Sequence, residues 1–179
     1  DKQSDGVVVA TLNRPQRLNA MGESMPAEYC RLPLEFDSDP DAKVLVITGA
    51  GRAFCAGGDF SADRQFEHGG YLNSMRHSRM IVDNMLDTEK PVISAVNGYA
   101  LGLGCTVALL SDVVIAARSA VFGDTHVRMG MGAGDGGQVL WPLLMGPARA
   151  KYHLMTGERL DAETAERLGL VSFVVDDEV

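Results

Sequence analysis

The sequence lacks the features that mark secreted, membrane-spanning and zinc-binding proteins. Its three cysteines, Cys30, Cys55 and Cys105, are odd in number and form no CxxC pair, which argues against a disulfide framework and a structural zinc site. No apolar run approaches the ~20 residues that span a bilayer. The first residues also lack the basic and apolar regions of a signal peptide. We therefore expect a protein of the cytoplasm.

Positive charge is scarce as well. The chain has 16 Lys and Arg against 24 Asp and Glu, and its formal net charge is -8. A surface of this sign repels a phosphate backbone, so we expect no nucleic-acid partner, although a local basic patch can still hold an anionic ligand. Apolar residues, in contrast, are plentiful: 46% of the 179 residues are hydrophobic. That is enough to bury the core of a single domain over residues 1–179.

The order of apolar patterns predicts strands and helices in alternation. Short β-branched runs ended by turn residues predict buried strands over residues 6–12, 43–49, 91–98 and 112–117. Helical spacing of apolar residues predicts helices over residues 71–86, 138–145 and 148–155. Strands that alternate with helices predict an α/β fold.

Capping residues and prolines refine this prediction at both ends of the chain. Asp161 is placed to cap a helix that Gly169 closes before a final strand. Pro26 and Pro33 are expected to interrupt the helix that residues 23–36 would otherwise form. Each proline ring removes a backbone donor and crowds the preceding turn.

Two glycine-rich segments each follow a predicted strand. Residues 49–60 are GAGRAFCAGGDF, and residues 97–105 are NGYALGLGC. Glycine allows close backbone approach, and a helix that begins in the second segment adds partial positive charge, so amide N–H groups of both can face an anion. Either segment alone is explained by a tight turn between a strand and a helix. The presence of both favours an anion site.

Both segments resemble the paired signature segments of the crotonase (enoyl-CoA hydratase/isomerase) superfamily. Shorter matches extend over nearly the whole chain, at residues 13–15, 18–20, 111–112, 122–123 and 154–157. The resemblance implies an α/β fold built as a crotonase-like spiral of ββα units, with assembly as a homotrimer or hexamer. It implies an acyl-CoA substrate, with no metal and no cofactor beyond the coenzyme A moiety. Family members usually continue into C-terminal helices, and we expect these to be absent here.

The resemblance also assigns roles to residues of both glycine-rich segments. The backbone amides of Gly58 and Leu103 would form an oxyanion hole for the thioester carbonyl. The position of Leu103 is usually glycine, which predicts a narrower acyl pocket. The residues implied to contact coenzyme A are Arg17, Leu18, Ala20, Ala56, Gly58, Asp59, Phe60 and Leu103.

The sequence departs from the family at the residues that transfer protons. The two usual glutamate positions hold Thr106 and His126. His126 titrates near neutrality, so it is either a general acid or base or a structural histidine. Thr106 either orients a water molecule or bonds its own helix backbone. Asp135, in the segment GAGDGG, is either a third proton-transfer candidate or the cap of the next helix.

Two other patterns favour no further site. Residues 132–137 match G-x-G-x-x-G, but they follow no clear strand, so a dinucleotide site is disfavoured. Cys55 and Cys105 lie inside the glycine-rich segments, where packing is the preferred interpretation.

The function predicted from the resemblance is that of an enoyl-CoA hydratase in fatty-acid or related acyl-CoA metabolism. An alternative is an enoyl-CoA isomerase, decarboxylase or carbon–carbon hydrolase that uses His126 and Asp135. A further alternative is a non-catalytic acyl-CoA-binding protein, which the threonine at position 106 favours.

Overall fold

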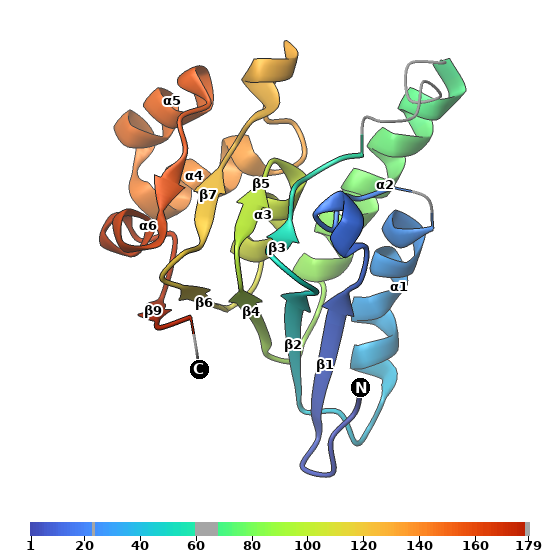
Figure 1. Ribbon diagram of the computed structural model, residues 1–179. Coiled ribbons are helices and arrows are strands. Elements are labelled where there is room, and N and C mark those ends of the chain that lie inside the picture. The colour runs from blue at the N-terminus through green and yellow to red at the C-terminus, as the bar shows by residue number, and fades with distance from the viewer. Residues whose placement is uncertain (23, 60–67, 178–179) are drawn as a thin grey trace.

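Two sheets organise the chain, whose computed structural model describes residues 1–22, 24–59 and 68–177, with the backbone alone for residues 68–74 (Figure 1). One sheet has five strands in the order β1-β2-β4-β6-β9, and the other has four in the order β3-β5-β7-β8. All neighbours are parallel except β7 and β8. The strands are β1 (Val7–Leu12), β2 (Val44–Gly49), β3 (Ala53–Cys55), β4 (Val92–Val96), β5 (Tyr99–Leu101), β6 (Val113–Ala117), β7 (Val121–Gly123), β8 (Leu160–Asp161) and β9 (Phe173–Val175).

A ββα unit recurs along the chain as β2-β3-α2, β4-β5-α3 and β6-β7-α4. In each unit the first strand lies in the five-stranded sheet and the second lies in the four-stranded sheet. This arrangement confirms the predicted α/β spiral of ββα units. The helices are α1 (Met25–Ser38), α2 (His68–Leu86), α3 (Leu103–Leu109), α4 (Gly137–Met145), α5 (Pro147–Thr156) and α6 (Ala162–Leu168), with short 3-10 turns η1 (Pro15–Arg17) and η3 (His126–Met129).

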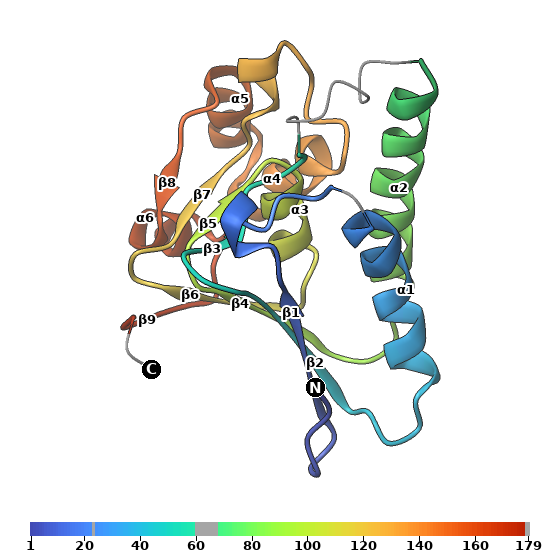
Figure 2. The same ribbon diagram turned by 45° about the vertical axis from the view of Figure 1, so that its right-hand side comes forward.

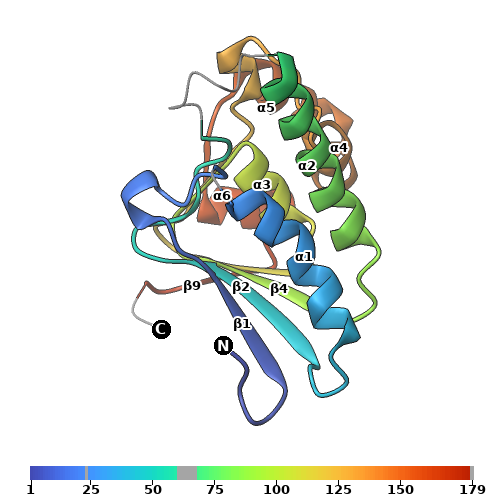
Figure 3. The ribbon, with the colours of Figure 1, turned by 90° about the vertical axis from the view of Figure 1, so that its right-hand side faces the viewer.

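The main core lies between the sheets and the helices. Helices α1 and α2 pack against each other along one side of the five-stranded sheet (Figure 3), while α5 and α6 lie near β7 and β8 (Figure 2). Phe54, Phe122 and Trp141 are fully buried. Burial of each such side chain contributes roughly 1.5–3 kcal/mol, so these large side chains fix how the sheets and helices meet.

The predicted strands and helices are confirmed, with one exception in α1. Pro26 and Pro33 do not interrupt this helix, which runs unbroken from residue 25 to residue 38. Pro26 lies in the first turn, where a backbone donor has no helical partner in any case. Pro33 lies inside the helix and is buried, so its packing offsets the hydrogen bond that its ring removes. At the other end, Asp161 caps α6 by accepting the Thr164 N–H at 2.7 Å, as predicted.

None of the helices in the described part of the chain is both long enough and apolar enough to cross a membrane. The cytoplasmic location stays a prediction.

Candidate active site

The two glycine-rich segments meet at one edge of the four-stranded sheet. Strands β3 and β5 are parallel neighbours with Cys55 opposite Ala100, so the segments that follow them leave the sheet on the same side. Their backbones touch: a Cβ added to Gly104 would lie 2.1 Å from the Cys55 carbonyl oxygen. A Cβ on Gly57, whose φ is +96°, would lie 2.8 Å from the Leu101 carbonyl oxygen. Only glycine permits this approach, because real side chains do not fit at such distances.

One side chain joins the two segments at their beginnings. The Asn97 side chain accepts the Gly49 N–H at 3.2 Å and donates to the carbonyl oxygens of Gly49 and Gly51, both at 2.8 Å. Next to it, a Cβ on Gly98 would lie 2.3 Å from the Arg52 carbonyl oxygen. These contacts fix the first segment against the second.

Two backbone amides where the segments meet have no backbone partner in the part of the chain that the structure describes. The N–H groups of Cys105 and Thr106 bond to the Gly102 carbonyl at 2.9 and 3.0 Å. Within residues 1–22, 24–59 and 68–177, no backbone hydrogen bond uses the N–H of Gly58 or of Leu103, the first residue of α3. The Leu103 side chain is 8% exposed and packs in the core, so the backbone rather than the side chain is the polar group available here.

An N-terminal segment lies alongside the first glycine-rich segment. The Ala56 N–H donates to the Leu18 carbonyl at 3.0 Å, and the Met21 N–H donates to the Gly57 carbonyl at 2.7 Å. The Asp59 N–H then donates to the Met21 carbonyl at 3.0 Å. Leu18, Ala56 and Asp59, which were predicted to contact coenzyme A, are thus brought together.

Arg14, which the sequence reasoning did not place in the site, ties these segments together. Its guanidinium donates to the Ala20 carbonyl at 2.6 Å and forms an ion pair with Asp59 at 3.0 Å, and both charged side chains are nearly buried. Arg17 is exposed on η1. Phe60 lies outside the described residues.

Asn19 fixes the turn that presents this segment. It is fully buried and has a positive φ of 54°. Its side chain accepts the Arg14 N–H at 2.8 Å and donates to the carbonyl oxygens of Ala50 and Ala53 at 2.9 and 2.7 Å. The asparagine therefore satisfies three backbone groups that burial would otherwise leave without partners.

Four polar side chains form a connected line beside the glycine-rich segments. His126 Nδ1 lies 2.8 Å from Asp124 Oδ1, and His126 Nε2 lies 3.1 Å from Asp135 Oδ2. The Thr106 hydroxyl donates to Asp135 Oδ1 at 3.1 Å. The four residues come from α3, the end of β7, η3 and the turn before α4. We call Thr106, Asp135, His126 and Asp124 the proton-transfer cluster, after the role that we propose for it below.

This cluster lies against the second glycine-rich segment. A Cβ added to Gly102 would lie 3.6 Å from His126 Cε1 and 3.9 Å from Nε2, which is ordinary van der Waals contact. Thr106 is on the helix that begins at Leu103. The proton-transfer cluster and the backbone amide of Leu103 therefore lie near each other.

The carboxylates on both sides of His126 determine its charge. The hydrogen bond to Asp124, followed by the contact with Asp135, raises the pKa of His126 to about 10, against the opposing effect of burial. The ring is thus an imidazolium at neutral pH and can donate a proton. The carboxylates of Asp124 and Asp135 are both in contact with this ring.

Two alternatives from the sequence are contradicted by these contacts. Thr106 does not bond its own helix backbone, because its hydroxyl donates to Asp135. Asp135 does not cap α4, whose N-cap is Gly136 and has no side-chain hydrogen bond. Both predictions of a structural role assumed local bonding, whereas the partners come from distant parts of the chain.

The remaining motifs keep the roles expected of them. Residues 132–137 follow η3 rather than a strand, so a dinucleotide-binding unit is not formed. Cys55 and Cys105 are fully buried, and burial raises the pKa of both thiols, that of Cys55 to about 12. Such thiols are packing groups rather than nucleophiles.

Asp124, His126 and Asp135 also offer three possible metal ligands, with one atom of each within 4.8 Å of the others. A cation at Nε2 would have to replace its proton. The raised pKa of His126 opposes that exchange.

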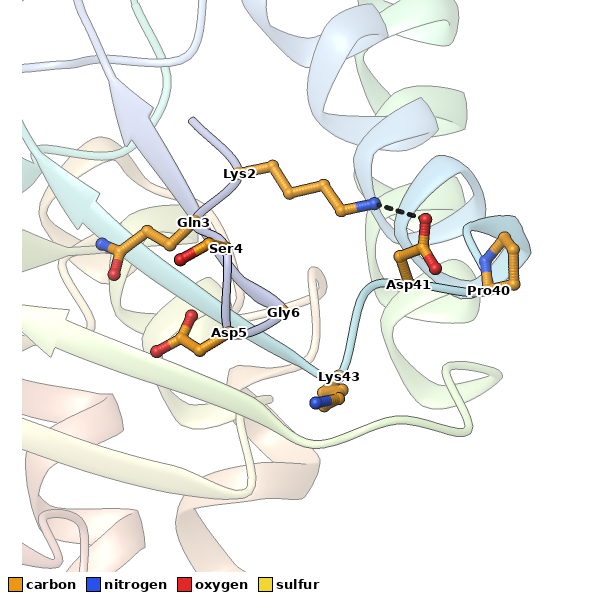
Figure 4. Close-up of a pocket in the computed structure, with 8 residues that line it drawn as sticks. All are labelled: Lys2, Gln3, Ser4, Asp5, Gly6, Pro40, Asp41 and Lys43. Carbon is orange, nitrogen blue, oxygen red and sulfur yellow. Dashed lines mark ion pairs between the residues drawn. The ribbon is translucent and has the colours of Figure 1, made fainter.

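A surface pocket of about 620 Å³ lies elsewhere, between the turn before β1 and the segment that enters β2 (Figure 4). Lys2 and Asp41 face each other across it at 3.6 Å. Its lining residues are Lys2, Gln3, Ser4, Asp5, Gly6, Pro40, Asp41 and Lys43, and none belongs to the proton-transfer cluster or to the glycine-rich segments.

Residues 2–179 match the model of the enoyl-CoA hydratase/isomerase family. The chain belongs to this family. It is 40% identical over 178 residues to the 1,2-epoxyphenylacetyl-CoA isomerase of Escherichia coli, covering 97% of this chain and 68% of that protein. It is 37% identical over 174 residues to the (E)-benzylidenesuccinyl-CoA hydratase of Thauera aromatica, with 97% and 68% covered.

The family's solved structures share the fold. An enoyl-CoA hydratase/isomerase from Mycobacterium paratuberculosis is 42% identical, with a TM-score of 0.92 over 99% of this chain and 72% of that one. An enoyl-CoA hydratase from Bacillus anthracis is 33% identical, with a TM-score of 0.94 over 99% and 69%. The chain spans about two thirds of the length of the curated relatives described above.

Proposed function

We propose that this family member is an acyl-CoA enzyme that acts as an enoyl-CoA hydratase. The thioester carbonyl is held between the amides of Gly58 and Leu103, and His126 and Asp135 transfer the protons. The observation that carries this proposal is the cluster itself: an acid and a base stand 3.1 Å apart against the segment that supplies one of the amides.

Binding uses the backbone of both glycine-rich segments. Charge that develops on the thioester oxygen is stabilised by two preorganised N–H groups, which contribute on the order of 10² to 10³ in rate. The coenzyme A moiety runs along the segment containing Leu18 and Ala20 and past Asp59. No cofactor beyond that moiety takes part.

Hydration follows from the charge states in the cluster. Asp135 takes a proton from water as the water oxygen bonds to the β-carbon of the 2-enoyl-CoA, and the resulting enolate oxygen rests on the two amides. His126 gives its Nε2 proton to the α-carbon. The proton on Asp135 then passes to His126, which returns both groups to their starting states with one water added. Thr106 holds the carboxylate through its other oxygen.

Double-bond isomerisation is the second candidate, because the acid His126 and the base Asp135 lie next to each other. Asp135 would remove a proton from the α-carbon of a 3-enoyl-CoA, and the same pair would return a proton at the γ-carbon after the double bond has moved. A relative that is 40% identical is named 1,2-epoxyphenylacetyl-CoA isomerase, so isomerisation of an acyl-CoA is named among the relatives.

Liquid chromatography coupled to mass spectrometry separates these candidates, because chromatography distinguishes two isomeric thioesters of equal mass. The full chain is incubated with matched 2-enoyl-CoA and 3-enoyl-CoA thioesters. Hydration adds the mass of one water, whereas isomerisation moves the double bond with no change in mass. Tight thioester binding without turnover on both substrates would contradict both enzymes and select the non-catalytic alternative.

We further propose that the protein assembles as a homotrimer or hexamer. Large apolar side chains are exposed on α4 and α5, among them Val139, Leu143 and Met155, which are 56%, 76% and 69% exposed. Exposed apolar groups of this kind favour association. Sedimentation at micromolar concentration tests the proposal, and a clean monomer would contradict it.

A further inference from the structure

Asp124 is a buried member of the proton-transfer cluster, with an exposed fraction of 1%. Its Oδ1 accepts the His126 backbone N–H at 3.2 Å and lies 2.8 Å from His126 Nδ1. One carboxylate oxygen therefore fixes both the backbone and the ring of the same histidine. Because a carboxylate only accepts, the ring nitrogen beside it must carry the proton.

The other oxygen of Asp124 is fixed by packing. Within the described residues, Oδ2 is buried and has no hydrogen-bond partner. A Cβ added to Gly137 would lie 2.3 Å from this oxygen. Glycine at the first residue of α4 is thus what leaves room for the carboxylate. A buried carboxylate is tolerated when an opposite charge compensates it, and the His126 imidazolium supplies that charge.

The opposite side of the ring faces the second carboxylate. Among the residues whose side chains the structure describes, the titratable groups that face His126 are Asp124 and Asp135. On α5, which packs against η3, the buried His153 instead directs its Nδ1 to the Glu158 carbonyl at 3.3 Å. Asp124 therefore holds the ring by a hydrogen bond at Nδ1, while Nε2 lies 3.1 Å from Asp135 Oδ2, which has no hydrogen-bond partner among the described residues.

We propose that Asp124 is a positioning residue that keeps His126 Nδ1 protonated and holds Nε2 beside Asp135. It acts through His126 and touches no reacting atom. The inference rests on the proposed proton transfer by His126 and Asp135. In other active sites an aspartate on the remote nitrogen of a catalytic histidine sets its tautomer and orientation in the same way.

The test compares two isosteric variants of the full chain. Asp124→Asn keeps the shape of the side chain and removes its charge. Asp37→Asn is the matched control, because Asp37 also accepts a backbone N–H, from Glu89 at 3.0 Å, and also has a buried oxygen without a partner among the described residues. Asp37 lies on α1, away from the cluster. Both are assayed for kcat and KM on the best acyl-CoA substrate, and the His126 ring nitrogens are followed by ¹⁵N NMR.

In the wild type and in Asp37→Asn we expect both ring nitrogens to be protonated at pH 8. In Asp124→Asn we expect one nitrogen to lose its proton by that pH, and kcat to fall about 10²-fold, the scale of a positioned acid or base, with little change in KM. A folded Asp124→Asn protein with a doubly protonated ring and the wild-type kcat would overturn the proposal.

Asp135→Asn gives a second test that leaves Asp124 in place. If Asp124 holds the ring, His126 should still titrate above its ordinary pKa of about 6.5 in this variant. A return to ordinary titration would overturn the proposal even if Asp124→Asn failed to fold. The NMR result is independent of turnover, so the proposed function can fail separately, through full activity of His126→Ala.

Discussion

The backbone half and the side-chain half of the site are built in different ways. The amides of Gly58 and Leu103 are placed by main-chain contacts, such as that between Gly104 and the Cys55 carbonyl, where no Cβ fits. The proposed acid, His126, and the proposed base, Asp135, are placed by contacts between side chains from separate parts of the chain. The first half therefore depends on local conformation, and the second depends on long-range packing.

This difference explains why residue types can change in the backbone half of the site, whereas they cannot change freely in the side-chain half. A leucine at position 103 leaves the backbone donor in place, because its side chain packs into the core. Replacing a glutamate with a threonine or a histidine changes which groups can carry a proton. In this chain the side chains of Thr106, His126 and Asp135 form one connected set.

The largest expected effect breaks the backbone half. Gly104→Ala would place a Cβ 2.1 Å from the Cys55 carbonyl oxygen. The two segments would have to separate, so we expect the free energy of unfolding to fall by about 3 kcal/mol and acyl-CoA binding to be lost. Gly132→Ala is the control, since nothing lies within 4 Å of a Cβ there. Chemical denaturation measures the free energy of unfolding, and titration with a saturated acyl-CoA measures binding. Equal stability of Gly104→Ala and Gly132→Ala would contradict the close contact between Gly104 and the Cys55 carbonyl.

The next effect breaks the side-chain half alone. His126→Ala should lower kcat by about 10² to 10⁴, the usual contribution of a positioned acid or base. The Kd for a saturated acyl-CoA should stay close to the wild-type value, because the amides do not depend on this side chain. His77→Ala, on α2, serves as the control. Steady-state kinetics with the wild-type rate in His126→Ala would show that the proton comes from another group.

The sequence allowed the backbone half to be predicted more fully than the side-chain half. Strand and turn patterns around Gly49 and Asn97 are local, so the strands that precede both glycine-rich segments, and the segments themselves, could be predicted. The role of Asp124 was missed because two residues so close in sequence give no sign of a special contact, and the burial that makes this contact important comes from α4. The continuous helix through Pro33 was also missed because of tertiary packing, which here outweighs the local preference of proline.

A smaller effect sharpens the comparison inside the cluster. Thr106→Val removes the hydroxyl that donates to Asp135 at 3.1 Å while keeping the branched shape of the side chain. We expect kcat to fall about 10-fold, near the 1–1.5 kcal/mol of one hydrogen bond. Thr48→Val, which removes a hydroxyl bonded to the Ala95 carbonyl, is the control and should leave kcat unchanged. Equal rates in both variants would remove Thr106 from the mechanism.

The smallest effect concerns stability against pH. The folded-state pKa of His126 is raised to about 10, so its charge stabilises the fold fully below about pH 6.5, the ordinary histidine value. The stabilisation is lost as pH rises through about 10. Denaturation of the wild type and of His126→Gln should show a stability difference that is largest near pH 6 and shrinks by pH 10.5. A difference that is independent of pH would contradict the ion pairs.

A crystal structure of Asp135→Asn with a bound 2-enoyl-CoA tests the central claim most directly. The slowed variant should hold intact substrate, with the thioester oxygen at hydrogen-bonding distance, about 3 Å, from the nitrogens of both Gly58 and Leu103, and with the α-carbon facing His126. A thioester oxygen more than about 4 Å from both nitrogens would contradict the account.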